Sequence, residues 1–140
     1  MPHGLSMDSE GSLWLTDVAM HQVGHTMFDA HRCETCVGIT QVFKYSPQGK
    51  QLLALGEAFV AGKDSKHFCK PTDVVLSNDR SAIFVADGYC NSRIVKLDGQ
   101  GMFLGEYTMD TNEKQLSIPH SLLLIESLDL LCVADRQNGR

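Results

Sequence analysis

Apolar residues occur in short runs along this chain, and the runs recur in the same order in three units. Each unit begins at a proline, passes through an apolar run, a polar turn and a second apolar run, and ends at an aspartate. The spacing from proline to aspartate is 15 residues in the first unit (2 to 17) and 16 in the others (71 to 87 and 119 to 135). Three units in phase indicate an internal repeat.

The apolar runs are predicted to be β-strands. They are short and are separated by turns rich in Gly, Asn, Asp and Ser, and helical periodicity is weak throughout. The expected strands are 2–8, 13–17, 43–46 and 51–55, then 71–76, 82–87, 93–97 and 102–107, then 119–124 and 129–135. Four antiparallel strands in about 40–50 residues are typical of a β-propeller blade. We therefore predict an all-β fold, with residues 1–140 forming about two and a half blades of a larger propeller.

The first unit is longer than the second, and we interpret residues 24–42 as an insertion. Without these 19 residues the first proline-to-proline spacing falls from 69 (2 to 71) to 50, close to the second spacing of 48 (71 to 119). Within the segment, His31, Cys33 and Cys36 look like half of a zinc site. No second pair of ligands follows at a suitable spacing, which favours a solvent-exposed loop or sequence from an alternative exon.

Composition and charge exclude some classes of function. The net charge of −5 argues against nucleic-acid binding, which needs a basic face. No apolar run is long enough to insert into a membrane, and no signal peptide is visible at the start. The five cysteines are compatible with either redox compartment.

Two histidines occupy the same position of the repeat and form a candidate metal site. His3 and His120 each follow the proline that opens a unit, and the middle unit has Thr72 there. In a propeller these positions line the central channel, so histidines on alternate blades would face one another. Imidazoles are common ligands of catalytic zinc. The alternative is that polar residues at these strand starts simply face channel water.

Tyr89 and Arg136 follow the second-strand aspartates, so we expect them at the same mouth of the channel. A tyrosine beside a metal and a guanidinium can act as a base, although an exposed aromatic residue in a turn has the same sequence signal. The recurrence of Asp17, Asp87 and Asp135 favours a structural role in bonding nearby backbone amides over a catalytic one. Cys69 and Cys90 enclose one pair of strands, and their spacing alone is equally compatible with a disulfide and with two free thiols.

Several motifs together resemble the lyase domain of peptidylglycine α-amidating monooxygenase, that is, peptidyl-α-hydroxyglycine α-amidating lyase (peptidylamidoglycolate lyase). They are Pro2–Leu5, Trp14–Val23, His67–Val74, Asp87–Val95, Pro119–Leu122 and Cys132–Arg140. The resemblance covers the chain outside 24–42. It implies a six-bladed propeller of NHL-type repeats that splits a peptidyl-α-hydroxyglycine into an amidated peptide and glyoxylate.

The resemblance also implies roles for individual residues. By matching positions, the two zinc ligands are His3 and His120, the calcium ligand is the backbone carbonyl of Leu5, the base is Tyr89, an active-site arginine is Arg136, one disulfide is Cys69–Cys90, and half of another is Cys132. The third histidine, a second arginine and most of the calcium site belong to other parts of the domain, so we expect this chain alone to be inactive.

The same resemblance implies a setting in the cell and a competing function. It implies a covalently linked monooxygenase domain and a location in the secretory pathway lumen, the secretory granule or the extracellular space. The alternative function is a non-catalytic NHL-type propeller whose mouth binds a protein partner. Matched metal ligands in the channel favour the enzyme, since a scaffold has no need of them.

Overall fold

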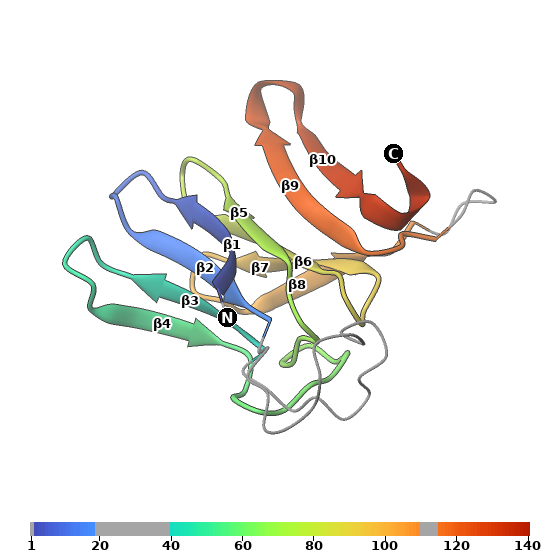
Figure 1. Ribbon diagram of the computed structural model, residues 1–140. Coiled ribbons are helices and arrows are strands. Elements are labelled where there is room, and N and C mark those ends of the chain that lie inside the picture. The colour runs from blue at the N-terminus through green and yellow to red at the C-terminus, as the bar shows by residue number, and fades with distance from the viewer. Residues whose placement is uncertain (1, 19–39, 110–114) are drawn as a thin grey trace.

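The computed structural model describes residues 2–18, 40–109 and 115–140, whose strands form three antiparallel sheets (Figure 1). The first sheet contains β1 (Pro2–Met7), β2 (Leu13–Asp17), β3 (Gln41–Tyr45) and β4 (Gln51–Leu55). The second contains β5 (Asp73–Leu76), β6 (Ala82–Asp87), β7 (Arg93–Asp98) and β8 (Phe103–Tyr107). The third contains β9 (Pro119–Ile125) and β10 (Leu130–Asp135). Within each sheet the strands pair in chain order, so the predicted all-β, blade-like order is confirmed.

The sheets pack face to face through two apolar clusters. One cluster joins the first and second sheets and includes Trp14, Val42, Val74 and Val85. The other joins the second and third sheets and includes Phe84, Ile94 and Leu122. Successive residues of a strand point to opposite faces, and this is why Phe84 and Val85 of β6 serve different clusters. The second sheet is therefore covered on both faces, with β6 buried from its second residue onward.

The two ends of the sheets differ in what they carry. At the turn end, a hairpin turn joins β1 to β2, another joins β5 to β6, and a third joins β7 to β8; Gly101, for example, adopts φ +88° in the last of these, a conformation that favours glycine. The mouth end is the opposite end, where β1, β5 and β9 begin and β2, β6 and β10 finish (Figure 1). The predicted channel residues all belong to the mouth end.

The predicted insertion 24–42 is only partly covered by the described residues. The predicted insertion 24–42 extends too far, because Gln41 and Val42 belong to β3 and Val42 is fully buried against Trp14. Residues 24–39, including His31, Cys33 and Cys36, lie outside the described residues. The helical segments in the described ranges are two 3₁₀ turns, 126–128 and 136–138, and no helix there has the length and apolarity to cross a membrane.

Candidate functional site at the mouth end

His3, Tyr89 and His120 meet at the mouth end from three different sheets. The Tyr89 hydroxyl lies 3.0 Å from His3 Nε2 and 3.3 Å from His120 Nε2. The two imidazole centroids are 4.8 Å apart, and the tyrosine ring stands nearly perpendicular to both. The arrangement expected from the repeat is therefore present: two histidines from alternate sheets face one another, and the tyrosine of the intervening sheet lies between them.

Irregular strand pairing accompanies both histidines. The β1–β2 register shifts between Pro2 and Leu5, and the β9–β10 register shifts at His120, which has no paired residue on β10. Such bulges are frequent beside active sites because they redirect a side chain away from the regular alternation. In the second sheet, by contrast, β5 pairs with β6 without a shift from Asp73 onward.

The backbone of the middle sheet determines the proton position on His3. Its Nδ1 lies 2.7 Å from the Thr72 carbonyl oxygen, which can only accept a hydrogen bond. Nδ1 therefore carries the proton and donates it, and in the neutral ring Nε2 has a free lone pair that faces Tyr89. Metal-binding histidines commonly show this pattern, with the distal ring nitrogen donating to a carbonyl or carboxylate.

The surroundings of His120 favour its neutral form. Burial lowers the pKa of His120, and the nearby positive charges of His3 and Arg136 lower it further, against the opposing charge of Asp73. Burial raises the pKa of the Asp73 carboxyl, while hydrogen bonds from the Leu122 and Val74 amides and the two histidines oppose that rise. A neutral imidazole is the form that binds a metal.

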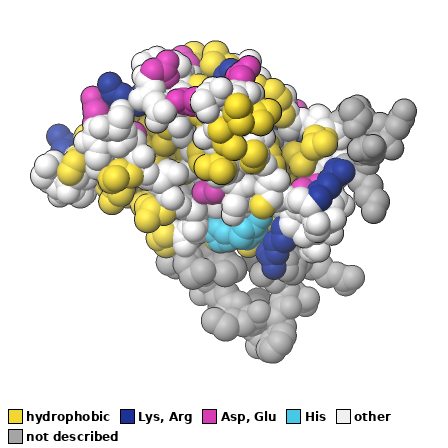
Figure 2. All heavy atoms as spheres, turned by 90° about the horizontal axis from the view of Figure 1, so that it is seen from above, with side chains coloured by type: hydrophobic (Ala, Val, Ile, Leu, Met, Phe, Trp, Pro, Cys, Tyr) yellow, Lys and Arg dark blue, Asp and Glu magenta, His cyan; other side chains and the backbone are white. Residues whose placement is uncertain are grey.

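The pair of histidines fits a zinc ion as two of its ligands. Both Nε2 atoms face the same hydroxyl oxygen, and His3 has the carbonyl partner expected of a ligand. A closed tetrahedral site needs further ligands, and the described residues contain no group of three or more His, Cys, Asp or Glu side chains placed to hold a metal. In the view of Figure 2, histidine side chains gather at one place on the surface, with basic side chains close by.

Two other predicted site residues have exposed side chains, Arg136 at the mouth end and Leu5 within β1. Arg136 begins the 3₁₀ turn after β10 with an exposed side chain, and its charge acts on His120. Leu5 lies in β1, two residues after His3, with 67% of its surface exposed. Its role as a calcium ligand through the backbone carbonyl stays a prediction.

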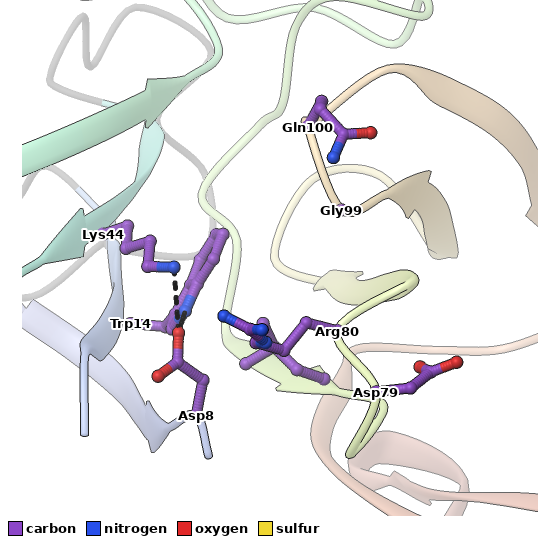
Figure 3. Close-up of a pocket in the computed structure, with 8 residues that line it drawn as sticks. Asp8, Trp14, Lys44, Asp79, Arg80, Gly99 and Gln100 are labelled. Atoms are coloured by element: carbon purple, nitrogen blue, oxygen red, sulfur yellow. Dashed lines mark hydrogen bonds and ion pairs between the residues drawn. The ribbon is translucent and has the colours of Figure 1, made fainter. Parts of the chain in front are cut away.

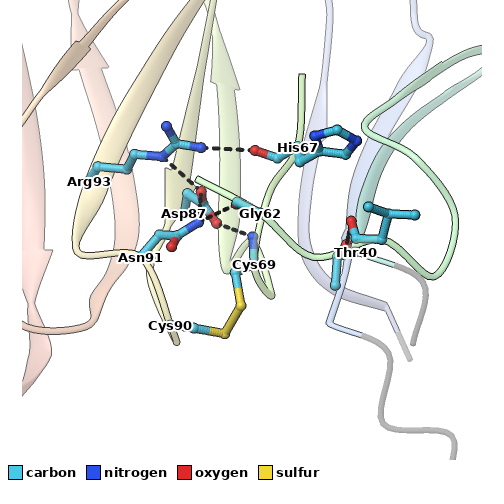
Figure 4. The surroundings of a disulfide bond; sticks show 9 residues. Thr40, Gly62, His67, Cys69, Asp87, Cys90, Asn91 and Arg93 are labelled. Atoms are coloured by element: carbon cyan, nitrogen blue, oxygen red, sulfur yellow. Dashed lines mark hydrogen bonds and ion pairs between the residues drawn. A yellow bond between two sulfur atoms is a disulfide. The ribbon is translucent and has the colours of Figure 1, made fainter. Parts of the chain in front are cut away.

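Cys69 and Cys90 are joined in a disulfide next to Tyr89, with Cα atoms 5.4 Å apart (Figure 4). This is the pairing that the family resemblance implies. It ties the segment entering β5 to the turn that follows β6. Cys132, the third cysteine in the described ranges, is free and exposed, and its expected partner past residue 140 stays a prediction.

A buried arginine anchors the same entering segment. Arg93 is 1% exposed, and its guanidinium donates five hydrogen bonds, the full set of its N–H groups. The acceptors are the carboxylates of Asp87 and Glu106 and the carbonyls of Lys63, Asp64 and His67, at 2.7–3.1 Å. Asp87 also accepts the Cys69 amide at 2.7 Å (Figure 4). Arg93 and its partner Asp87 thus hold the segment that connects the first and second sheets.

The third sheet repeats this arrangement. Asp135 accepts the Ser117 amide at 2.7 Å, the Asn138 side-chain amide at 2.7 Å and Arg140 Nε at 3.0 Å. In both sheets the accepted backbone amide lies 18 residues before the aspartate. The structural role predicted for these aspartates agrees with the contacts of Asp87 and Asp135, but the expected partners were wrong. The backbone amide that each aspartate accepts belongs to the segment that enters the inner strand, whereas the turn that follows the aspartate donates through side chains such as Asn91 and Asn138.

Sequence reasoning missed Arg93 and the contacts of Thr72 and Asp73. An available signal for the first was the repeated order of Asp, Asn and Arg in Asp87–Arg93 and Asp135–Arg140. Thr72 was noted only as the residue that replaces histidine in the middle unit. Nothing in its sequence neighbourhood indicates that its carbonyl contacts a residue 69 positions away.

A separate polar hollow lies at the turn end between the first and second sheets (Figure 3). The labelled lining residues are Asp8, Trp14, Lys44, Asp79, Arg80, Gly99 and Gln100. Its two cationic groups are paired within the protein, Lys44 with Asp8 and Arg80 with Glu10, and the Asp79 carboxylate accepts hydrogen bonds from Ser77 and from the Ser81 amide. The hollow is remote from the histidines, since the two features occupy opposite ends of the sheets.

Comparison with known proteins identifies relatives that match along the whole chain. Mouse peptidyl-glycine alpha-amidating monooxygenase is 45% identical over 147 residues, and a probable peptidyl-alpha-hydroxyglycine alpha-amidating lyase of Caenorhabditis elegans is 44% identical over 143. Both matches cover 100% of this chain, which spans only 13% of the mouse protein and 35% of the nematode protein. No protein-family model matches the chain.

A solved structure supports the fold. The structure of streptogramin B lyase, a β-propeller, matches 86% of this chain and 30% of its own with a TM-score of 0.50. The sequence identity is 17%, so this likeness concerns the fold alone. The three sheets described above are thus arranged as propeller blades.

Proposed function

We propose that this chain forms part of the active site of a peptidyl-α-hydroxyglycine α-amidating lyase. The premise is that the chain is related to these lyases along its whole length. The reaction splits a peptidyl-α-hydroxyglycine into an amidated peptide and glyoxylate. One observation carries the proposal: the Tyr89 hydroxyl lies within hydrogen-bond distance of Nε2 of both His3 and His120. A scaffold that binds a protein partner has no use for this convergence.

Tyr89 serves as the general base in the proposed reaction. It removes the proton of the substrate hydroxyl, the oxygen's electrons form the carbonyl of glyoxylate, and the C–N bond breaks with its electrons passing to nitrogen. Protonation of that nitrogen gives the peptide amide. The neighbouring positive charge of Arg136 would hold the carboxylate at the end of the substrate. The exposed position of Arg136 at the mouth suits contact with a ligand that arrives from solvent.

His3 and His120 would hold a zinc ion through Nε2. When bound, zinc supplies a positive centre that polarises oxygen and lowers the pKa of nearby hydroxyl groups. The chain's own contribution is to orient both imidazoles, through the Thr72 carbonyl for His3 and through the bulge in β9 for His120. Since the described residues supply two such ligands, we expect the 140-residue chain alone to bind zinc weakly and to be inactive. Calcium at the Leu5 carbonyl is a further, structural part of the proposal.

The proposed context is a secretory enzyme. The Cys69–Cys90 disulfide supports an oxidising compartment, such as the secretory pathway lumen, a secretory granule or the extracellular space. The mouse relative is named a monooxygenase and is far longer than this chain. We therefore propose that a monooxygenase domain is covalently linked to the lyase in the natural protein.

The decisive experiment replaces Tyr89 in the natural full-length protein. Tyr89→Phe should keep its zinc, measured by metal analysis after dialysis, and lower kcat by roughly 10²–10⁴, the usual contribution of a general base. Tyr45→Phe is the matched control, because Tyr45 lies in β3 and its hydroxyl donates to the Gln51 side chain at an exposed site. His120→Ala should lose both zinc and turnover. Near-normal turnover of Tyr89→Phe would show that the base is assigned to the wrong residue.

A further inference from the structure

The start of β5 contacts both histidine-bearing strands through two consecutive residues. The Thr72 carbonyl accepts the His3 Nδ1 proton, and the Thr72 hydroxyl lies 2.7 Å from the Pro119 carbonyl. The next residue, Asp73, accepts the Leu122 amide through Oδ2 at 2.8 Å and its neighbour's amide through Oδ1 at 2.9 Å. The middle sheet thus bonds to the residue before His120 and to the residue two positions after it.

These side-chain contacts replace a backbone ladder. Within the described residues, β9 pairs with β10 alone and β5 pairs with β6 alone, so no β-ladder joins the second and third sheets there. The two sheets otherwise meet through apolar packing around Phe84 and Leu122, which is non-directional. A hydrogen bond to a carboxylate is directional and stronger than one between neutral groups. Asp73 can therefore fix how far β9 lies along β5.

The packing on both sides of this junction leaves little room for adjustment. A Cβ added at Gly4 would lie 2.6 Å from Asp73 Cα and 2.7 Å from Asp73 Oδ1. A Cβ added at Gly88, next to Tyr89, would lie 2.0 Å from the Pro119 carbonyl oxygen. Glycine at both positions allows the three backbones to approach closely. A shift of β9 would consequently change the distance from His120 to Tyr89.

We propose that Asp73 is a positioning residue, whose carboxylate holds β9 against β5 and so keeps His120 over the point shared by His3 and Tyr89. This inference rests on the proposed lyase function for its effect on turnover. Its effect on the histidine geometry does not depend on that function. The prediction is that the reach of the side chain at position 73 matters, and not only its charge.

Two uncharged replacements separate reach from charge. The amide oxygen of Asp73→Asn can still accept the Leu122 amide, whereas the hydroxyl of Asp73→Ser is too short to span that distance. In the natural full-length protein, Asp73→Ser should lower zinc affinity and kcat by roughly 10–100-fold, the usual effect of losing a partner that orients a ligand. Asp73→Asn should stay much closer to the original protein in both measurements.

The matched control is Asp98→Ser in the turn between β7 and β8. Asp98 also accepts two backbone amides, those of Gln100 and Met102, but at the opposite end of the same sheet. It should leave zinc affinity and kcat unchanged. The proposal is overturned if Asp73→Ser behaves like the original protein, if Asp73→Asn and Asp73→Ser lose function equally, or if Asp98→Ser loses zinc affinity as Asp73→Ser does.

A metal-free measurement distinguishes this proposal from the proposed function. In protein stripped of metal, the ¹⁵N chemical shifts of the His120 ring should change in Asp73→Ser and not in Asp98→Ser. A full-length protein without lyase activity would refute the proposed function and leave this comparison valid. If Asp73→Ser does not fold, Asp73→Thr replaces it, because threonine has an equally short hydroxyl and a higher preference for β-strands. An unchanged His120 ring in a folded Asp73→Thr variant would then overturn the proposal.

Discussion

The turn end and the mouth end of the sheets are stabilised in different ways. At the turn end, Asp8 accepts the amides of Glu10 and Ser12, and Asp98 makes the same two bonds in the second sheet, to the amides two and four residues further on. At the mouth end, the corresponding contacts join distant parts of the chain. His3 reaches Tyr89, 86 residues away, and Asp73 reaches a residue in the third sheet, 49 away.

Contacts at the turn end stabilise single hairpins, whereas contacts at the mouth end place the sheets relative to one another and so assemble the site. A turn that bonds within itself needs only its own few residues, so its loss loosens one hairpin. The mouth exists only when the sheets are correctly placed against one another, so a change there alters their relative position. The proposed active site therefore depends on contacts between sheets, and the following substitutions compare the two ends.

The largest effect on stability is expected from Arg93→Met at the mouth end. It leaves the fully buried Asp87 carboxylate without its cationic partner and frees three backbone carbonyls of the entering segment. Breaking a buried ion pair on one side costs about 3–5 kcal/mol of unfolding free energy. Urea denaturation followed by tryptophan fluorescence measures this loss.

The control for that experiment is Arg80→Met at the turn end. Arg80 pairs with Glu10, and both side chains are largely exposed. Exposed pairs contribute about 0–1 kcal/mol, so the unfolding free energy should change little. Equal losses in the two variants would contradict the distinction between the two ends.

A smaller effect is expected from removing the Cys69–Cys90 disulfide. The bridge closes a segment with a sequence separation of 21 residues, for which the chain-entropy model gives about 3 kcal/mol. The double variant Cys69→Ala/Cys90→Ala should lose about 3 kcal/mol of unfolding free energy. Its urea denaturation midpoint should therefore lie at a lower concentration than that of the original protein. Cys132→Ala should unfold at the original concentration, because Cys132 is exposed and free. An unchanged midpoint in the double variant would mean that the bonds of Asp87 and Arg93 already fix the entering segment.

Sequence predicted the strands and the histidine pair because both are local or repetitive properties. The alternation of apolar residues gave ten strands close to those of the structure, with β3 starting at Gln41 as the main displacement. His3 and His120 could be paired because they share a position in the repeat. A repeat transfers a position from one unit to the next, and that is sufficient to bring two such residues to the same mouth.

The remaining part of the site could not be predicted because it depends on how the sheets approach one another. Three of the five bonds of Arg93 go to carbonyls of a connecting segment that has no regular structure of its own. The contacts of Thr72 and Asp73 appear only when β9 lies against β5. A residue that departs from the repeat, as Thr72 does between two histidines, has no equivalent from which its role could be transferred.

The smallest predicted effect concerns Asp8 at the turn end and depends on pH. Burial raises the pKa of the Asp8 carboxyl, but the Lys44 ammonium, the Trp14 indole N–H and the Ser12 and Glu10 amides more than offset this and lower the pKa to about 2. A carboxyl with a lowered pKa in the folded state stabilises the fold above its unfolded pKa of about 3.9. That contribution is lost as the pH falls from about 4 through 2.

Asp8→Asn tests this because it removes the charge and keeps the shape. At pH 7 the variant should be less stable than the original protein by at most about 2.6 kcal/mol, given that one pKa unit corresponds to about 1.4 kcal/mol. The gap should narrow as the pH falls from 4 to 2, where the Asp8 carboxyl of the original protein also becomes neutral. Asp129→Asn, at an exposed position before β10, is the control for the loss of one carboxylate charge. A gap that stays constant between pH 7 and pH 2 would mean that Asp8 stabilises the turn through shape and neutral hydrogen bonds, so that even the charged contacts of Lys44 at this end contribute little.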